Sequence, residues 1–226
     1  MAITDFIYYG NSGANQFGEL VEHSSLENPL SSDSGGQYCK KMIMPSTSAY
    51  EGIYLNLDGF YSVPDSKAVS LSAWFRMGNS KAKPGLFAKS YNYYTGFRYD
   101  YGLFIYDSST IKFSNADYDN PYAETLEGQW VKLKLDIIPI RNTDGVAVGD
   151  RLIGSIGRIE NGSLVWAQLD DLFLEKIVPA GITSKYVAND NSQYKYYGYA
   201  QPYPASTNGA GGIWYVDNFK MIVQDL

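Results

Sequence analysis

The stretch GQWVKLKLDIIPI (Gly128–Ile140) alternates apolar and polar side chains with unusual regularity. Val131 and Leu133 fall on one side of an extended chain and Lys132 falls on the other, because successive side chains of a strand point to opposite faces. A period of two predicts a half-buried strand and not a helix. Pro139 has no backbone N–H, so we expect it to end this strand or to lie at a sheet edge.

Similar short apolar stretches recur along the chain, broken by Gly, Asn, Asp, Ser and Pro, and helical periodicity is almost absent. This pattern is typical of an antiparallel sandwich or barrel. Residues 150–176 predict a hairpin around ENGS, with a further strand or short helix from Leu169. Other strands are expected at Asp5–Gly10, Gln37–Met44, Gly52–Gly59, Val69–Met77, Gly85–Tyr91, Tyr101–Asp107 and Thr110–Ala116.

The C-terminal stretch GGIWYVDNFKMIV (Gly211–Val223) admits two interpretations. It is either a contact surface, with Trp214 and Tyr215 exposed, or the closing strand of the fold. Strict alternation leaves neither of its faces wholly apolar. We therefore expect a bulge near Asp217 that switches the inward side from Trp214 to Phe219.

The composition excludes two classes of partner. The 226 residues carry a net charge of −6 and contain no Lys/Arg-rich run, whereas nucleic-acid binding needs a basic patch. No apolar run approaches the roughly 18–20 residues of a membrane span, so no membrane insertion is expected. The N-terminal MAITDFIYYG lacks a basic region followed by a long apolar core, and we expect no signal peptide.

Little in the sequence points to catalysis or to a cofactor. His23 is the only histidine, in a polar stretch, and Cys39 is the only cysteine, which we expect to be a buried structural thiol. Asp171 and Glu175 share a strand face, but four residues of strand span roughly 13 Å, which is too far for a glycosidase pair. The sequence therefore predicts that the protein is not an enzyme.

One acidic stretch, NADYDNPYAE (Asn115–Glu124), has oxygen ligands at alternate positions. Asp117, Asp119 and Asn120 are the candidate ligands of a calcium ion. The full pattern of a calcium-binding helix–loop–helix is missing, and a solvated turn accounts for the residues equally well. No cofactor other than calcium is expected.

Tyrosine is the unusual feature of the composition, with 21 residues among an aromatic content of 15%. Two runs, SYNYYTGFRYDYG (Ser90–Gly102) and YKYYGY (Tyr194–Tyr199), hold so many rings that strand alternation cannot bury them all. Aromatic rings stack on sugars and form protein contacts. The candidate ligand-binding residues are Tyr91, Tyr93, Tyr94, Tyr99, Tyr101, Tyr194, Tyr196, Tyr197 and Tyr199.

The order of the strands resembles the laminin-G-like, concanavalin A-like lectin domains. YLNLDGFYSVPDSKAVSLSAWFRM (Tyr54–Met77) is similar to the opening of such domains, which read roughly L-x-F-D-G-x-x-x-V-P followed by L-S-x-W-F-R. GLFAKSY, YGLFIYD, EGQWVKLKLDII and IWYVDNFKMIV follow in the matching order. The resemblance implies an all-β fold: an antiparallel β-sandwich of the concanavalin A-like jelly-roll type. No calcium ligands of the family can be carried over.

The richness in Tyr, Asn, Ser and Gly also resembles structural proteins of tailed bacteriophages, several of which carry lectin-like sandwiches. We therefore expect a non-enzymatic virion protein, a capsid decoration or a head or tail appendage, assembled in the host cytoplasm. Its expected partners are other virion proteins, copies of itself in a homo-oligomer, and surface glycans. A free-standing carbohydrate-binding module is the main alternative, and a glycoside hydrolase is a third.

We expect one domain over residues 1–226. Within it, 1–50 would hold N-terminal strands and a long loop, and 51–226 would form the lectin-like core.

Overall fold

The computed structural model describes residues 6–10, 19–22, 38–43, 51–55, 67–91, 98–113, 120–121, 125–145, 147–175, 199–200 and 212–225. These ranges contain strands and turns and no helix. No helix within them is therefore long and apolar enough to cross a membrane.

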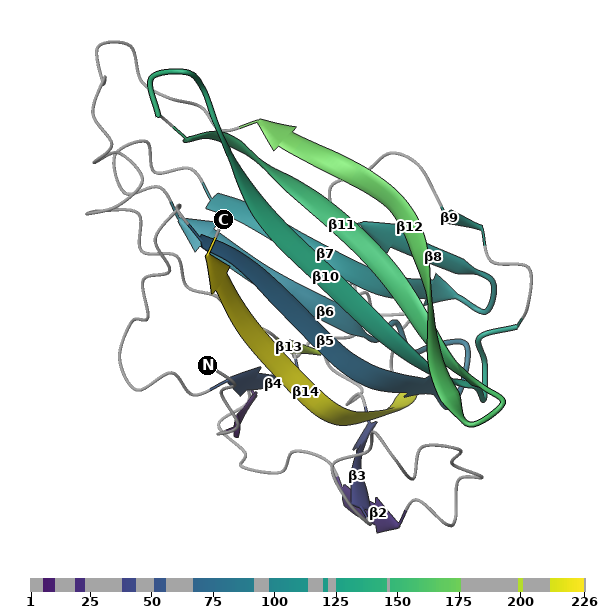
Figure 1. Cartoon of the computed structure of the whole chain (residues 1–226). Helices are drawn as coiled ribbons and strands as arrows, with labels where there is room; N and C mark the ends of the chain where they lie inside the picture. The colour runs from purple at the N-terminus through teal and green to yellow at the C-terminus, as the bar shows by residue number, and fades with distance from the viewer. Residues whose placement is uncertain are drawn as a thin grey trace.

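Two antiparallel sheets make up most of the described structure (Figure 1). The larger has seven strands in the order β12-β11-β10-β5-β14-β3-β2, and the smaller has five in the order β13-β6-β7-β8-β9. The long strands of the larger sheet lie in front of β6, β7 and β8 in Figure 1. A separate two-stranded pair joins β1 to β4. The fold is an antiparallel β-sandwich, as the sequence predicts.

The strands of the seven-stranded sheet are β2 (Glu19–Glu22), β3 (Tyr38–Ile43), β5 (Lys67–Met77), β10 (Trp130–Arg141), β11 (Ala147–Glu160), β12 (Ser163–Glu175) and β14 (Ile213–Asp225). Those of the five-stranded sheet are β6 (Gly85–Tyr91), β7 (Arg98–Asp107), β8 (Thr110–Phe113), β9 (Asn120–Pro121) and β13 (Tyr199–Ala200). The remaining pair is β1 (Phe6–Gly10) and β4 (Glu51–Leu55). The N-terminal region 1–50, expected to hold strands and a long loop, includes the short strand β2.

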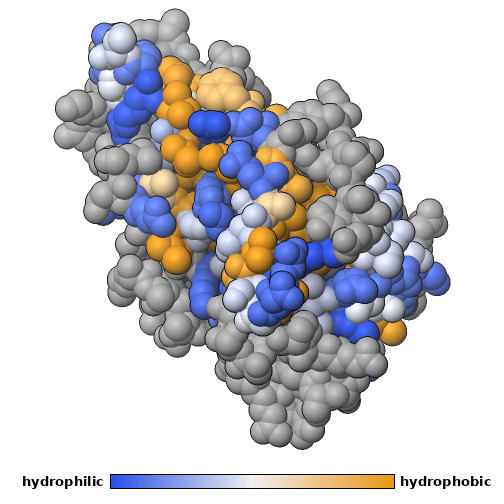
Figure 2. Space-filling model, turned by 45° about the vertical axis from the view of Figure 1, so that its right-hand side comes forward, coloured by the Kyte–Doolittle hydropathy of each residue, from blue (hydrophilic) through white to orange (hydrophobic). Residues whose placement is uncertain are grey.

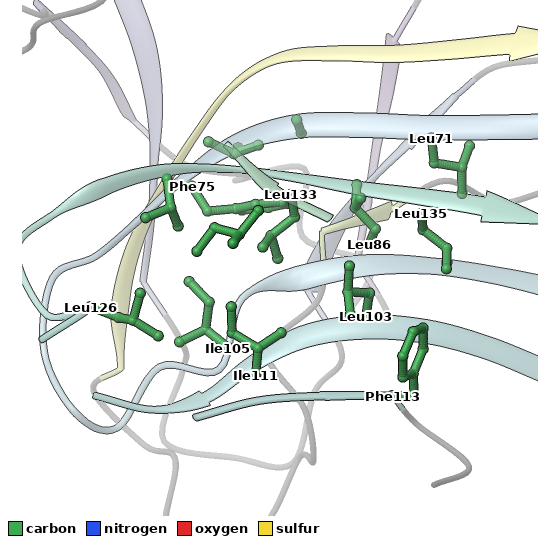
Figure 3. Close-up of a cluster of buried hydrophobic side chains, with 14 of the residues drawn as sticks. Leu71, Phe75, Leu86, Leu103, Ile105, Ile111, Phe113, Leu126, Leu133 and Leu135 are labelled. Carbon is green, nitrogen blue, oxygen red and sulfur yellow. The ribbon is translucent and has the colours of Figure 1, made fainter. Parts of the chain in front are cut away.

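The main core fills the space between the two sheets (Figure 3). Because side chains alternate along β5 and β10, every second residue of each strand points inward, and those in the core are apolar. These inward side chains face the apolar side chains of β6, β7 and β8. The sheets approach closely at Gly154, where an added Cβ would lie 3.0 Å from Phe113 Cζ and 3.1 Å from Leu103 Cδ1. The fully buried members include Leu71, Phe75, Leu86, Leu103, Ile105, Ile111, Leu133 and Leu135.

β10 continues through Pro139, so this proline does not end the strand. The pairing of β10 with β5 stops at Ile137, whereas its pairing with β11 continues beyond Pro139. Among the described residues, β10 is therefore paired on one side only at Pro139, as a strand is at a sheet edge.

The closing strand β14 belongs to the architecture of the fold. Trp214 is fully buried in the main core and its ring centroid lies 6.4 Å from that of Phe75. The register shifts between Asp217 and Lys220, and Asn218 adopts a φ of 47°. Beyond this bulge Met221 pairs with Leu71 of the inner face. The predicted bulge and the switch of the inward side are confirmed.

The predicted hairpin is also confirmed. Asn161 and Gly162 have φ values of 49° and 76° and connect β11 to β12. Two consecutive residues with positive φ give the turn whose twist matches that of the flanking strands. β12 is one continuous strand over Ser163–Glu175, so the strand or helix expected to begin at Leu169 is its second half, which follows a bulge.

Candidate functional site

The candidate site lies on the outer face, by which we mean the side of the seven-stranded sheet turned away from the main core. Pairing registers align outward positions of neighbouring strands in rows that run across the sheet. One of these, the aromatic row, consists of Trp166, Gly157, Lys132, Trp74 and Asp217 on strands β12, β11, β10, β5 and β14.

Trp166 presents its ring to solvent in this row. Its side chain lies over Gly157, where an added Cβ would come 3.0 Å from Trp166 Cε3. The residue is 40% exposed, whereas Trp74 of the same row is fully buried. A large exposed ring packed over a glycine offers the kind of platform on which sugars and other flat apolar groups stack.

The next row across the same strands, the polar row, contains only hydrogen-bonding side chains. Gln168 of β12 pairs with Ser155 of β11, which pairs with Lys134 of β10. Lys134 pairs in turn with Ser72 of β5, which pairs with Lys220 of β14. Because residues two apart on a strand point the same way, the polar row lies beside the aromatic row, roughly 7 Å from it.

Cations and aromatic rings interleave on the outer face. Lys132 Nζ lies 5.5 Å from the ring centroid of Trp74, and Lys134 Nζ lies 5.8 Å from that of Trp166. Arg76 Cζ lies 5.3 Å from the ring centroid of Tyr215. These distances are those of cation–π contacts. They hold the lysine ammonium groups at the aromatic row.

One end of the outer face is a second, smaller apolar cluster. Cys39, Trp74 and Trp130 form it, with Ile159, Leu164 and Tyr215 packed against them. Burial, with a further contribution from Asp217, raises the pKa of the Cys39 thiol to about 11. The thiol is therefore protonated near neutral pH and is a poor nucleophile. The prediction of a buried structural thiol is confirmed.

Acidic groups occupy the row beyond the polar row. Asp136 of β10 and Asp171 of β12 both pair with Ile153 of β11, so the two carboxylates share a face two strands apart, roughly 10 Å between Cα atoms. Lys134 Nζ lies 2.9 Å from Asp136 Oδ2, and Arg151 Nε lies 2.6 Å from Asp171 Oδ2.

From sequence alone, Asp171 was compared with Glu175 of its own strand, and the cross-strand Asp136 was missed. The hairpin prediction pairs β11 with β12, but the register of β10 against β11, which places Asp136 two strands from Asp171, does not follow from either stretch. Trp166 and the polar row were missed for the same reason, because a row across a sheet appears only when the registers of several strands are known.

A different cationic cluster lies on the outer side of the five-stranded sheet. Lys83 Nζ and Lys112 Nζ lie 3.7 Å and 3.9 Å from the ring centroid of Tyr106. Burial opposes ionisation of the neighbouring Asp107, but hydrogen bonds from Ser109 and Thr110 outweigh it and lower the pKa of this carboxyl. The cluster thus combines two cation–π contacts with a carboxylate that is held ionised.

The predicted tyrosine surface lies partly within the described residues. Tyr91, Tyr99 and Tyr101 belong to the paired strands β6 and β7, and Tyr199 belongs to β13, which pairs with β6. Ends of both tyrosine runs therefore meet in one sheet. The backbone register puts the positions of Tyr99 and Tyr101 on the side of Leu103, the inner face, and those of Tyr91 and Tyr199 on the opposite side. Tyr93, Tyr94, Tyr194, Tyr196 and Tyr197 lie outside the described residues.

The calcium prediction falls mostly outside the described residues as well. Asp117 and Asp119 are not among them, and Asn120 lies in β9, paired with Ile111. Among the residues that are described, no three His, Cys, Asp or Glu side chains gather in a way that could hold a metal ion.

No protein-family model matches the sequence, and no curated protein matches it either. Solved structures do match in fold. The carbohydrate esterase from Shiga toxin-encoding bacteriophage phi24B has a TM-score of 0.51 and 10% identity, over 97% of this chain and 90% of that one. Arcelin-5, a lectin-like defense protein from Phaseolus vulgaris, has a TM-score of 0.47 and 8% identity, over 98% and 93%. The catalytic domain of the glycoside hydrolase family 131 protein from Coprinopsis cinerea has 0.48 and 13%, over 99% and 87%.

The prediction that the protein is not an enzyme, which rested on the lack of a recognisable catalytic set in the sequence, is contradicted by this comparison. The bacteriophage esterase has the same fold and is named for a catalytic activity, so a lectin-like sandwich gives no ground for excluding catalysis. The fold itself is as the resemblance implied. The chain is an antiparallel β-sandwich of the concanavalin A-like jelly-roll type.

Proposed function

We propose that the protein is a glycan-binding component of a bacteriophage virion, and that the glycan lies along the polar row of the outer face against Trp166. The observation that carries this proposal is the exposed ring of Trp166 over Gly157, beside five consecutive hydrogen-bonding positions. Glycan sites need both parts, because a sugar has an apolar face that stacks on a ring and a rim of hydroxyl groups that hydrogen-bond.

The hydrophobic character of this face supports the proposal. Figure 2 shows hydrophobic residues in a band between hydrophilic residues on the face of the molecule that it presents. Trp166 of β12 is 40% exposed on the outer face. Exposed rings in such a setting usually mark a contact surface.

The test of glycan binding is the substitution Trp166→Ala, measured by calorimetry or a glycan array. We expect binding to fall at least about tenfold, equivalent to about 1.4 kcal/mol. Phe173→Ala is the matched control, since it removes another exposed ring of the same strand and face outside the two rows. We expect it to keep most of the binding. Unchanged glycan binding by a folded Trp166→Ala variant would refute the assignment.

The virion part of the proposal draws on the sequence resemblance to phage structural proteins. On this account the surfaces away from the outer face contact other virion proteins or further copies of the chain, and the two tyrosine runs add contacts to a glycan or to these partners. Mass spectrometry of purified particles of the encoding phage tests it. We expect the protein among the structural components, and its absence from intact particles would contradict a virion role.

A carbohydrate-active enzyme is the second candidate, and one observation favours it. The spacing of Asp136 and Asp171, two strands apart on the outer face, approaches the separation of roughly 6.5–9.5 Å used by inverting glycosidases. Both carboxylates contact cations, however, as structural ion pairs do. Asp136→Asn and Asp171→Asn test the candidate on any glycan that binds. Loss of hydrolysis with retained binding would support it, and an absence of hydrolysis by the unaltered protein would exclude it.

A further inference from the structure

We infer that the glycan is acidic and that Lys134 selects it. This inference rests on the proposed function and adds the chemical class of the ligand. The aromatic and polar rows together hold three lysines, Lys132, Lys134 and Lys220, against one carboxylate, that of Asp217. The chain as a whole carries a net charge of −6. The two rows thus carry a net positive charge, whereas the net charge of the whole protein is negative.

Lys132 and Lys134 differ in what they offer to a ligand. Lys132 is 4% exposed and lies over the buried Trp74, so it adds positive potential from below the surface. Lys134 has a side chain that is 35% exposed and lies beside Trp166. A sugar stacked on Trp166 would therefore bring its substituents close to the ammonium of Lys134.

Lys134 keeps the capacity to bind a ligand carboxylate while it contacts Asp136. An ammonium group has three N–H donors, and the contact of 2.9 Å with Asp136 uses one of them. A charge-assisted hydrogen bond to a uronic or similar acid is stronger than one to a neutral hydroxyl. Lys134 is thus the specificity-determining residue, whereas Trp166 binds the sugar ring of acidic and neutral glycans alike.

The test compares a linear oligouronate with a neutral oligoglucoside of equal length, by calorimetry, for the unaltered protein and for Lys134→Gln. We expect the oligouronate to bind at least about tenfold more tightly at low salt and the preference to shrink as ionic strength rises. Lys134→Gln should remove the preference and leave the affinity for the neutral glycan nearly unchanged, while Lys134→Arg should retain it. Lys112→Gln, which removes a lysine from the opposite sheet, is the matched control and should leave the preference intact.

The outcomes separate the inference from the function on which it rests. Equal binding of the two glycans, lost in Trp166→Ala, would overturn the acidic ligand and leave the glycan site standing. A preference for the oligouronate that persists in Lys134→Gln would overturn the role of Lys134. Binding of neither glycan, or binding that survives Trp166→Ala, would overturn the glycan site and the inference together.

Discussion

On the inner side of the seven-stranded sheet, β5 and β10 present Leu71, Phe75 and Leu133, all fully buried against the second sheet. On the outer side the same strands carry Lys132 and Lys134, whose ammonium groups lie over tryptophan rings. Both sides bury aromatic surface. Among the described residues, the outer side also combines rings with charges and leaves the rings of Trp166 and Phe173 exposed. Since alternate residues of a strand serve opposite faces, substitutions one position apart should affect different properties.

The largest effect is expected from truncation in the inner core. Phe75→Ala should lower the free energy of unfolding by roughly 3–5 kcal/mol, because it leaves a cavity where a fully buried ring packs against Trp214. Trp166→Ala on the outer face should cost about 1 kcal/mol or less. Urea denaturation of both variants measures the difference. Similar losses would contradict the division between a stabilising face and a binding face.

A matched pair of glycines sharpens the comparison. Gly154→Ala brings a methyl group against Phe113 and Leu103 inside the core and should cost roughly 1–3 kcal/mol of stability. Gly157→Ala brings the same group against the outward side chains of Trp166 and Leu164, at 3.0 Å and 2.9 Å. There the exposed ring can shift, so we expect a smaller loss of stability and a weaker affinity for glycans.

Denaturation and glycan titration of the two alanine variants measure these effects side by side. If Gly157→Ala bound glycans with the same affinity as the unaltered protein, glycan binding would not depend on the position of the Trp166 ring.

A smaller effect is expected for the ion pair at the edge strand. Arg151 and Asp171 are 50% and 42% exposed, so solvent screens their attraction. Arg151→Ala should change the free energy of unfolding by less than about 1 kcal/mol, and added salt should reduce even that difference. A loss of several kcal/mol in urea denaturation would mean that this pair holds β12 in place.

The smallest effect concerns Cys39 and appears only at alkaline pH. Burial raises the pKa of its thiol from 9.0 to about 11, so between these values the unfolded chain ionises while the folded chain does not. Stability should therefore fall as pH rises from about 9 towards 11. Cys39→Ala should flatten this part of the stability curve. Rapid modification of Cys39 by a thiol reagent in the native protein at neutral pH would contradict its burial.

The sequence predicted what depends on local alternation and failed where several strands must be aligned. The strand containing Lys132, the hairpin at Asn161 and the bulge at Asp217 follow from short-range pattern and turn chemistry. Trp166 and Asp136 entered the candidate site only through registers between β10, β11 and β12. These registers depend on pairings that no single stretch of sequence encodes.

The four tryptophans provide the most direct test of the account, because each indole N–H gives its own signal in an NMR titration. Trp214 lies in the inner core, Trp74 and Trp130 are buried on the outer face, and Trp166 is exposed there. On addition of the oligouronate we predict the largest shift for Trp166, smaller shifts for Trp74 and Trp130, and none for Trp214. A glycan that binds without shifting Trp166, or that shifts Trp214 as much, would contradict a binding site on the outer face.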